Sequence, residues 1–206
     1  MKVLLINGSP HEKGCTYTAL SLITGELKAQ GIETEILHVG GQPVGGCIGC
    51  GGCRSGNGCV FGGVVNEAIE KAKTADAFVF GSPVHYASAA GNMASFMDRL
   101  AYAGGKYLAY KPAAVCCSAR RAGTTSTLDQ LVKSPQFFHM PLVNGSYWAM
   151  VHGSNPEQVL QDAEGCAVMQ ELGRNMAWLL RCIEAGKAAG IDHPQNPPRP
   201  MTSFIR

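Results

Sequence analysis

Apolar runs and polar turns alternate along the chain and predict alternating strands and helices. The run Val3–Ile6 is apolar without interruption, which is typical of a strand buried on both faces. Apolar residues then recur at helical spacing and predict a helix over 15–30, ended by Gly31. The first unit of the chain is therefore strand, turn and helix.

The same alternation continues to the end of the last predicted helix. Further strands are predicted over Glu33–Val39, Ala77–Gly81, Ala113–Cys117 and Leu142–Tyr147. Further helices are predicted over Val64–Ala75, Ala89–Tyr102, Ser126–Val132 and Pro156–Ala189, the last with a break near Gly165. This pattern predicts an α/β fold with a five-stranded, doubly wound parallel sheet of order 2-1-3-4-5. A ligand is expected at the carboxyl ends of the strands.

Two segments do not fit the alternation. Residues 40–63 are rich in Gly and Cys and have no periodicity, and so long an irregular insert is usually functional. Residues 192–206 contain Pro194, Pro197, Pro198 and Pro200 and are predicted to be extended. We therefore expect one domain over 1–191, carrying the insert, and a C-terminal arm over 192–206.

Composition narrows the class of protein. A formal net charge of +2 in 206 residues gives no strong field for nucleic acid or a membrane. Residues 1–6 are too short for a secretion signal, and no stretch is apolar enough to cross a bilayer. A cytoplasmic protein is expected, in which the nine cysteines are reduced, catalytic or metal-bound rather than paired in disulfides.

The first turn has the features of a phosphate-binding loop. The start of a helix leaves backbone N–H groups unpaired, Ser9, Thr16 and Thr18 add hydroxyl donors, and Gly8 and Gly14 permit close approach. The loop lacks both the Gly-x-x-x-x-Gly-Lys-Ser/Thr and the Gly-x-Gly-x-x-Gly patterns. Its neutral donors suit a single terminal phosphate, as in the FMN loop of flavodoxin-like proteins. The other interpretation is an ordinary strand–helix turn with Ser and Thr caps.

Two later loops are expected at the same edge of the sheet. They are Ser82–Tyr86 after the third strand and Ser118–Thr125 after the fourth. Both are polar, as the Gly8–Thr18 loop is, so together the three loops are predicted to line one ligand site.

Several motifs recur in one order and resemble those of a known family. They are Gly8-Ser9-Pro10, the cysteine cluster Cys47–Cys59, Gly81–Tyr86, the pair Asp98-Arg99, and Thr202–Arg206. Over nearly its whole length the chain resembles the NAD(P)H-dependent FMN reductases of flavodoxin-like fold, including the iron–sulfur flavoproteins.

The resemblance implies FMN as cofactor and assigns roles to individual residues. The phosphate contacts would be Ser9, Thr16 and Thr18, with Pro10, His11, Lys13 and Cys15 in the same loop. The ring contacts would be Pro83, Val84, His85 and Tyr86, and Ser118, Arg120 and Gly123 would approach the polar edge of the ring. The family commonly has Tyr at position 85, Asn at 15 and Lys at 94, where this chain has His85, Cys15 and Ala94. No catalytic acid or base is implied.

The cysteine cluster has the spacing C-x2-C-x2-C-x5-C over Cys47, Cys50, Cys53 and Cys59. Four cysteines match the ligand count of a [4Fe–4S] cluster, and the iron–sulfur flavoproteins have the same compact spacing. Zinc and free thiols are the alternatives. The run is more compact than most structural zinc sites, which separate two Cys pairs by a longer loop. Cys116, Cys117, Cys166 and Cys182 are expected to be buried packing residues.

Together these features predict an FMN-dependent NAD(P)H oxidoreductase. Its acceptor would be a quinone, a free flavin, an azo or nitro compound, or a similar small molecule, with a [4Fe–4S] cluster as a further electron carrier. The competing classes are a non-enzymatic flavodoxin-like electron carrier and a zinc-binding module without flavin. The family resemblance and the Pro-rich arm also imply a homodimer or homotetramer.

Overall fold

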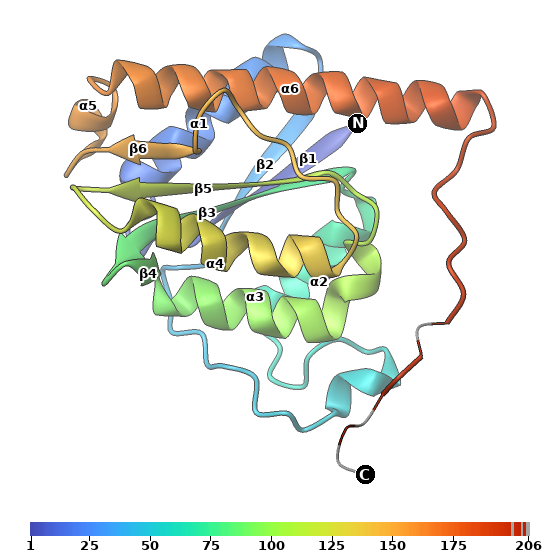
Figure 1. The fold of residues 1–206 in the computed structure, drawn as a ribbon. Helices are drawn as coiled ribbons and strands as arrows, with labels where there is room; N and C mark the ends of the chain where they lie inside the picture. The colour runs from blue at the N-terminus through green and yellow to red at the C-terminus, as the bar shows by residue number, and fades with distance from the viewer. Residues whose placement is uncertain (199, 203, 205–206) are drawn as a thin grey trace.

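A sheet of five parallel strands forms the centre of the molecule (Figure 1). The computed structural model describes residues 1–198, 200–202 and 204. The strands are β1 (Lys2–Asn7), β2 (Glu33–His38), β3 (Ala77–His85), β4 (Ser88–Ala89), β5 (Ala113–Ala119) and β6 (Met150–His152). The order is β2-β1-β3-β5-β6, and β4 pairs antiparallel with the end of β3. This confirms the predicted doubly wound order, with β6 as the fifth parallel strand.

Helices cover both faces of this sheet. They are α1 (Cys15–Ala29), α2 (Val64–Thr74), α3 (Gly91–Gly104), α4 (Thr124–Phe137), α5 (Pro156–Val159) and α6 (Ala163–Ala188), with short 3-10 helices η1 (Gly52–Ser55) and η2 (Gly105–Tyr107). In Figure 1, α1 and α6 lie on one side of the strands, and α2, α3 and α4 lie on the other.

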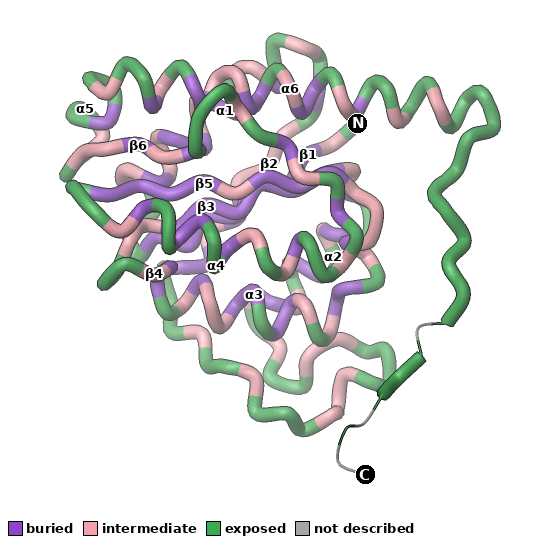
Figure 2. Tube along the Cα trace, in the orientation of Figure 1, coloured by how far each residue is buried: buried purple, intermediate pink, exposed green. Residues whose placement is uncertain are grey.

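The core is divided by the sheet into two apolar layers. Side chains alternate along β1, so that Val3 and Leu5 pack in the layer of α1 and α6, and Leu4 and Ile6 pack in the other. All four are at most 1% exposed. The central strands are buried along almost their whole length in Figure 2, which is the physical reason for the uninterrupted apolar run in the sequence.

The predicted fifth strand, Leu142–Tyr147, was wrong. Leu142 makes an isolated bridge to Ala113, and the chain then leaves the sheet. It returns at β6, where Met150 pairs with Cys117. The residues between Leu142 and Met150 belong to no strand, so pairing with β5 occurs in two separate pieces.

The loops after the third and fourth strands are shorter than predicted. Residues 82–85, expected in a loop, continue β3, because Val84 and His85 pair with β4. Ser118 belongs to β5, and α4 begins at Thr124 and ends at Phe137, beyond the predicted 126–132. The last helical tract breaks before Gly165, because Asp162 caps α6 by accepting a hydrogen bond from the Gly165 N–H at 2.9 Å.

The cysteines outside the insert differ in burial. Cys116 and Cys117 on β5 are buried, and burial raises the pKa of Cys117 to about 12. Cys166 is half-buried and Cys182 is exposed on α6. The expectation of a buried packing residue was therefore wrong for Cys182, which lies on the outer side of the helix.

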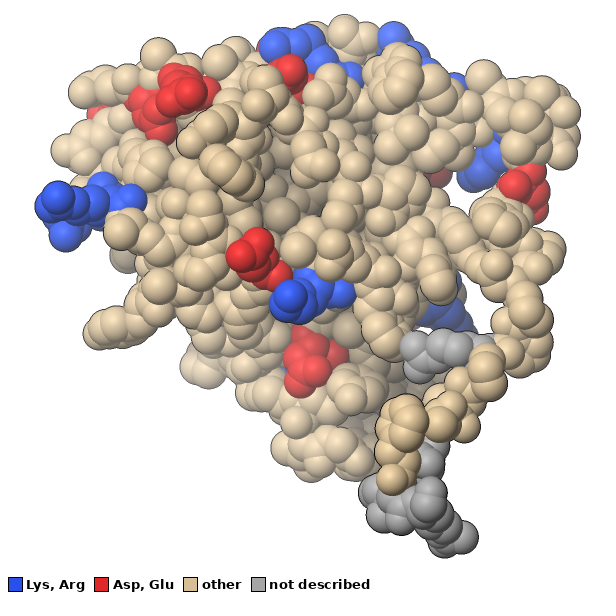
Figure 3. Space-filling model, viewed as in Figure 1, with Lys and Arg blue, Asp and Glu red and all other residues tan. Residues whose placement is uncertain are grey.

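Charged side chains are scattered over the face shown in Figure 3. In the part of the chain that the structure describes, no helix has the length and apolar character needed to cross a membrane.

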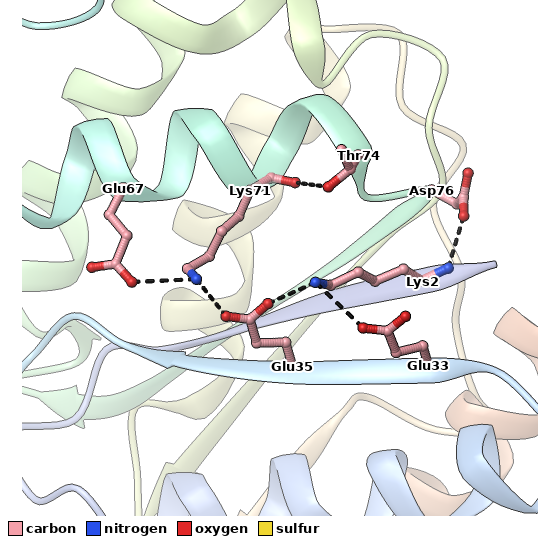
Figure 4. Close-up of polar contacts among 7 residues, drawn as sticks. All are labelled: Lys2, Glu33, Glu35, Glu67, Lys71, Thr74 and Asp76. Atoms are coloured by element: carbon pink, nitrogen blue, oxygen red, sulfur yellow. Dashed lines mark hydrogen bonds and ion pairs between the residues drawn. The ribbon is translucent and has the colours of Figure 1, made fainter.

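An ion network joins β1, β2 and α2 at the end of the sheet where β1 begins (Figure 4). The Glu35 carboxylate lies 2.8 Å from Lys2 Nζ and 2.6 Å from Lys71 Nζ. The hydrogen bond from Lys2, followed by that from Lys71, holds the pKa of Glu35 below its ordinary value. Asp76 adds a bond by accepting from the Lys2 N–H at 2.7 Å.

Replacing Glu35 by glutamine is expected to make the free energy of unfolding depend less on pH in the acid range. Because the folded-state pKa of Glu35 is depressed, its contribution is present above the unfolded pKa and is lost as pH falls through the folded pKa. Glu35→Gln should cost at most about 1 kcal/mol at pH 7 and nothing at acid pH. Urea unfolding at a series of pH values measures this, with exposed Glu184→Gln as control. A penalty independent of pH would contradict it.

Candidate functional site

The start of α1 lies at the carboxyl end of β1 and presents uncapped backbone N–H groups. The residue that precedes the helix is Gly14, and no side chain caps the first turn. The first N–H groups of a helix have no intrahelical partner, and the helix dipole favours an anion there. Burial raises the pKa of the Cys15 thiol, so this side chain stays neutral at pH 7 and adds no negative charge at the helix start.

Asn7 folds the loop between β1 and α1. This fully buried side chain accepts a hydrogen bond from the Ser9 N–H at 3.1 Å and donates to the Glu12 carbonyl at 2.9 Å. Ser9 Oγ in turn accepts from the His11 N–H at 3.1 Å. Asn7 was not among the predicted site residues, although a polar residue at the end of an apolar strand was a signal for it.

The loop is also held from outside. His38 Nε2 lies 2.8 Å from the Ser9 carbonyl oxygen. Gly8 packs directly on α3, because a Cβ at this position would lie 2.7 Å from Met93 Cβ. Gly40 is still closer, since a Cβ there would lie 2.1 Å from the Ser9 carbonyl oxygen. The insert and α3 therefore determine the position of the loop.

Two predicted site residues from different loops are in contact. Thr16 Oγ1 and Ser118 Oγ are 2.8 Å apart, and both residues are buried. Thr18 Oγ1 donates to the Gly14 carbonyl at 3.2 Å. The Thr16–Ser118 bond joins the start of α1 to the end of β5, across the carboxyl edge of the sheet.

The predicted ring loop forms a tight hairpin between β3 and β4. Tyr86 and Ala87 have φ values of 50° and 58°, which cost energy in residues other than glycine. The hairpin is fixed by α4, because Gln130 Oε1 accepts from the Ala89 N–H at 2.8 Å and Ser126 Oγ donates to the Ala87 carbonyl at 2.7 Å. Pro83 and Val84 are half-buried, whereas the side chains of His85 and Tyr86 are exposed.

The third loop, after β5, touches the hairpin. Gly123 has φ 92°, and a Cβ there would lie 2.7 Å from Ala87 Cα and 2.9 Å from Val84 Cγ1. Because Ser118 also contacts Thr16, the three predicted loops meet at one edge of the sheet. The outer residues of these loops, Pro10, His11, Lys13 and Arg120, are exposed.

A fourth loop joins them. Cys15 Sγ donates to the Gly153 carbonyl at 3.5 Å, so the residues after β6 lie against the start of α1. His152, at the end of β6, lies with Nδ1 3.5 Å from Asp162 Oδ2. This loop was not predicted, because the fifth strand was expected too early in the chain. The only signal for it was the short Met-Val-His run followed by Gly153.

The cysteine insert forms a second candidate site below α3. A cavity of about 190 Å³ is lined by Cys47, Cys50, Cys53 and Cys59, together with residues of α3 that include Arg99 and Tyr102. Among the described residues, no three Cys, His, Asp or Glu side chains are gathered closely enough to hold a metal ion. The four thiols thus share one cavity, and they would have to move closer together to share one metal centre.

The backbone around Cys59 is held by Asn66 of α2. Its amide accepts from the Cys59 N–H at 2.8 Å and donates to the Cys59 carbonyl at 3.0 Å. On the other side of the cavity, the Gly49 N–H donates to Cys47 Sγ at 3.5 Å. Four sulfur donors, an N–H to sulfur bond and a buried arginine fit the chemistry of an iron–sulfur cluster.

The insert is joined to α3 at its first residues. Asn92 donates from Nδ2 to the carbonyls of Gly40 at 3.1 Å and Gln42 at 3.0 Å, and it accepts from the Val44 N–H at 3.2 Å. The same helix therefore carries contacts to the first loop and to both ends of the insert.

The sheet order and the loops at its carboxyl edge define a flavodoxin-like protein. A solved structure of RosB, with a bound 8-demethyl-8-formylriboflavin-5′-phosphate intermediate, superposes with TM-score 0.70 at 14% identity, covering all of this chain and 96% of that one. The apo form of an NADH:FMN oxidoreductase superposes with TM-score 0.61 at 20% identity, covering 88% of each chain.

A profile of the NADPH-dependent FMN reductase family matches residues 1–155. An iron–sulfur flavoprotein of Methanocaldococcus jannaschii is 28% identical over 192 residues, which cover 89% of this chain and all of the relative. The chain therefore belongs to the NADPH-dependent FMN reductase family and is an oxidoreductase of that type, as the sequence predicted.

Proposed function

We propose that this protein binds FMN at the carboxyl edge of the sheet and oxidises NAD(P)H in favour of a small-molecule acceptor. The observation that carries the proposal is the meeting of three loops beside the uncapped start of α1. Bound FMN would supply the redox chemistry, because a flavin can accept a hydride and pass on the two electrons one at a time or together.

The first loop would hold the phosphate. The N–H groups at the start of α1 supply fixed donors, and Ser9, Thr16 and Thr18 supply hydroxyls at the same end of the helix. Thr16 and Thr18 already hydrogen-bond within the protein, so their hydroxyls would act by a further bond to the anion or by exchanging partners. Lys13 is exposed beside the loop and adds positive charge there, and the exposed His11 ring adds polar nitrogen atoms.

The hairpin and the third loop would hold the ring. Half-buried Pro83 and Val84 offer an apolar surface, and exposed Tyr86 offers an aromatic one. Ser118 and Gly123 would approach the polar edge of the ring, with the exposed Arg120 cation in the same loop. No dinucleotide loop is present in the sequence, so NAD(P)H and the acceptor would use the same exposed face in turn. A quinone, free flavin, azo or nitro compound fits such a face.

The insert would hold a [4Fe–4S] cluster through Cys47, Cys50, Cys53 and Cys59. The spacing, the shared cavity and the buried arginine beside Cys59 support this assignment. Zinc would use the same sulfurs and give a colourless centre. Reduced thiols of this kind suit the cytoplasm.

The test is anaerobic purification followed by visible spectroscopy, iron and sulfide assay, and NAD(P)H oxidation with each acceptor class. We expect a flavin spectrum, four irons and four sulfides per chain as for a [4Fe–4S] cluster, and steady-state turnover. Protein that stays colourless after FMN addition would refute the flavin site. Bound FMN without turnover would make the protein an electron carrier instead.

We also propose that the arm over 192–206 reaches a second subunit in a homodimer or homotetramer. The start of the arm is docked on its own chain, because His193 stacks on Tyr110 with ring centroids 4.4 Å apart and Asn196 Nδ2 donates to Tyr110 Oη at 2.6 Å. Met201 and Phe204 beyond it are 87% and 91% exposed, which leaves apolar surface for a partner. Positions 199, 203 and 205–206 lie outside the described residues. Removal of residues 192–206 should lower the number of subunits in the particle, as measured by its mass in solution relative to the mass of one chain. An unchanged number of subunits would refute this role.

A further inference from the structure

Arg99 is a buried cation without a carboxylate partner. It lies on α3 and is 7% exposed, and within the described residues it is the one charged side chain among the buried polar residues. The ion pairs of the described residues do not include it, and the neighbouring Asp98 is exposed. A buried charge is costly unless it is paired and hydrogen-bonded, so its surroundings indicate what it serves.

The guanidinium of Arg99 is surrounded by the cysteine insert. Its Nε donates to Cys59 Sγ at 3.3 Å, and one terminal nitrogen donates to the Gly62 carbonyl at 3.0 Å. The other terminal nitrogen reaches the Gly45 carbonyl at 3.5 Å, and the Phe61 ring centroid lies 5.5 Å from the guanidinium carbon. One planar group thus bridges both ends of the insert and one predicted cluster ligand.

These contacts give Arg99 two separable properties. The fork of donors fixes the position of the Cys59 sulfur relative to the backbone on either side of the cavity. The guanidinium carries a positive charge, and none of the ion pairs among the described residues balances it. A negatively charged centre in the cavity would be its partner. Hydrogen bonds and charge next to cluster sulfurs are known to tune the reduction potential of iron–sulfur centres.

We propose that Arg99 is the positioning residue for the Cys59 ligand, and that its charge favours the reduced form of the centre held by the insert. This inference rests on the proposed [4Fe–4S] site. Reduction of the cluster would add one electron, which a chemical reductant supplies in the experiment below. The added negative charge would be stabilised by the Arg99 guanidinium, which donates a hydrogen bond to the Cys59 sulfur.

The experiment compares Arg99→Met and Arg99→Lys with the wild-type protein. Arg99→Met removes both the donor fork and the charge, whereas Arg99→Lys keeps the charge on a flexible stem. Arg174→Met on α6 is the matched control, because it removes an arginine that pairs with Glu26 far from the insert in the sequence. Each protein is purified anaerobically and assayed for FMN, iron and sulfide, and its cluster is titrated with dithionite while the EPR signal of the reduced form is recorded.

For Arg99→Met we expect a cluster whose equilibrium constant for one-electron reduction falls about tenfold, equivalent to about 59 mV, with unchanged FMN content. Arg99→Lys should stay within about threefold of the wild-type constant, about 28 mV on the same scale, and Arg174→Met should match the wild type. If Arg99→Met binds FMN but no iron, retention of iron by Arg99→Lys supports the role of the charge, and loss in both supports the role of the fork.

Three results would overturn the inference. If Arg99→Met holds a full cluster whose reduction potential is unchanged, Arg99 only fills space between α3 and the insert. Loss of FMN and of the far-ultraviolet circular dichroism signal in both Arg99 variants would show that the arginine supports the whole fold rather than the centre. A wild-type protein that takes up no iron and sulfide refutes the proposed cluster itself, and this inference with it.

Discussion

Replacing Gly40 by alanine is expected to destabilise the protein by about 3 kcal/mol and to weaken FMN binding at least about tenfold. The new Cβ would lie 2.1 Å from the Ser9 carbonyl oxygen, 2.4 Å from the Ser9 carbonyl carbon and 2.6 Å from the Gly8 carbonyl oxygen. All three are backbone atoms, so no side chain can rotate away, and the first loop itself must shift. That loop carries the predicted phosphate contacts.

The matched control is Gly45→Ala in the same insert. A Cβ at Gly45 meets nothing within 4 Å, and neither Gly40 nor Gly45 has a positive φ. The two substitutions therefore differ in space and not in backbone conformation. Urea unfolding gives the stability, and quenching of flavin fluorescence on titration gives the affinity. Equal affinities in the two variants would mean that the first loop is not part of the flavin site.

Replacing Cys53 by serine is expected to abolish iron and sulfide binding while leaving FMN bound. A [4Fe–4S] cluster of this kind needs four thiolates, and the described chain offers one cysteine quartet with this spacing. Cys53 lies on η1, which faces the shared cavity and lies apart from the loops at the sheet edge. The measurement is the iron, sulfide and FMN content per chain after anaerobic purification.

Cys182→Ser is the control for this substitution, because Cys182 is exposed on α6. It should retain iron and FMN at the wild-type level. Equal iron in both variants would place any metal elsewhere. Zinc in place of iron in the wild type, lost on Cys53→Ser, would support the zinc alternative and remove electron transfer through the insert.

The fold was predictable because its central strands are buried on both faces. A continuous apolar run as short as Val3–Ile6, bounded by polar turn residues, is typical of a strand with an apolar layer on each side. The helices between the strands end at clear signals such as Gly31 with φ 75°. The last strand was mislocated because β6 is only three residues long and its pairing with β5 is interrupted. A pattern of apolar residues cannot distinguish an interrupted strand from a continuous one.

The candidate site was predictable only as a set of loops. The meeting of Thr16 with Ser118 follows from parallel topology, since all parallel strands end at one edge. The hairpin at Tyr86 was hidden, because neither Tyr86 nor Ala87 is a residue that prefers positive φ. The contact of Cys15 with Gly153 was missed because Gly153 follows β6, and the fifth strand was predicted earlier in the chain. The role of Arg99 leaves no local sequence pattern, because its partners Cys59 and Gly62 are about forty residues away along the chain.

The position of α3 has a consequence for how this chain can vary. Met93 lies under the first loop, and Arg99, six residues later, holds Cys59. At 1.5 Å per residue, the helix separates the two contacts by about 9 Å along its axis. One residue inserted or deleted between them would rotate one contact relative to the other by about 100° around the helix axis. A variant of this sequence that keeps both centres is expected to keep the number of residues from Met93 to Arg99 unchanged.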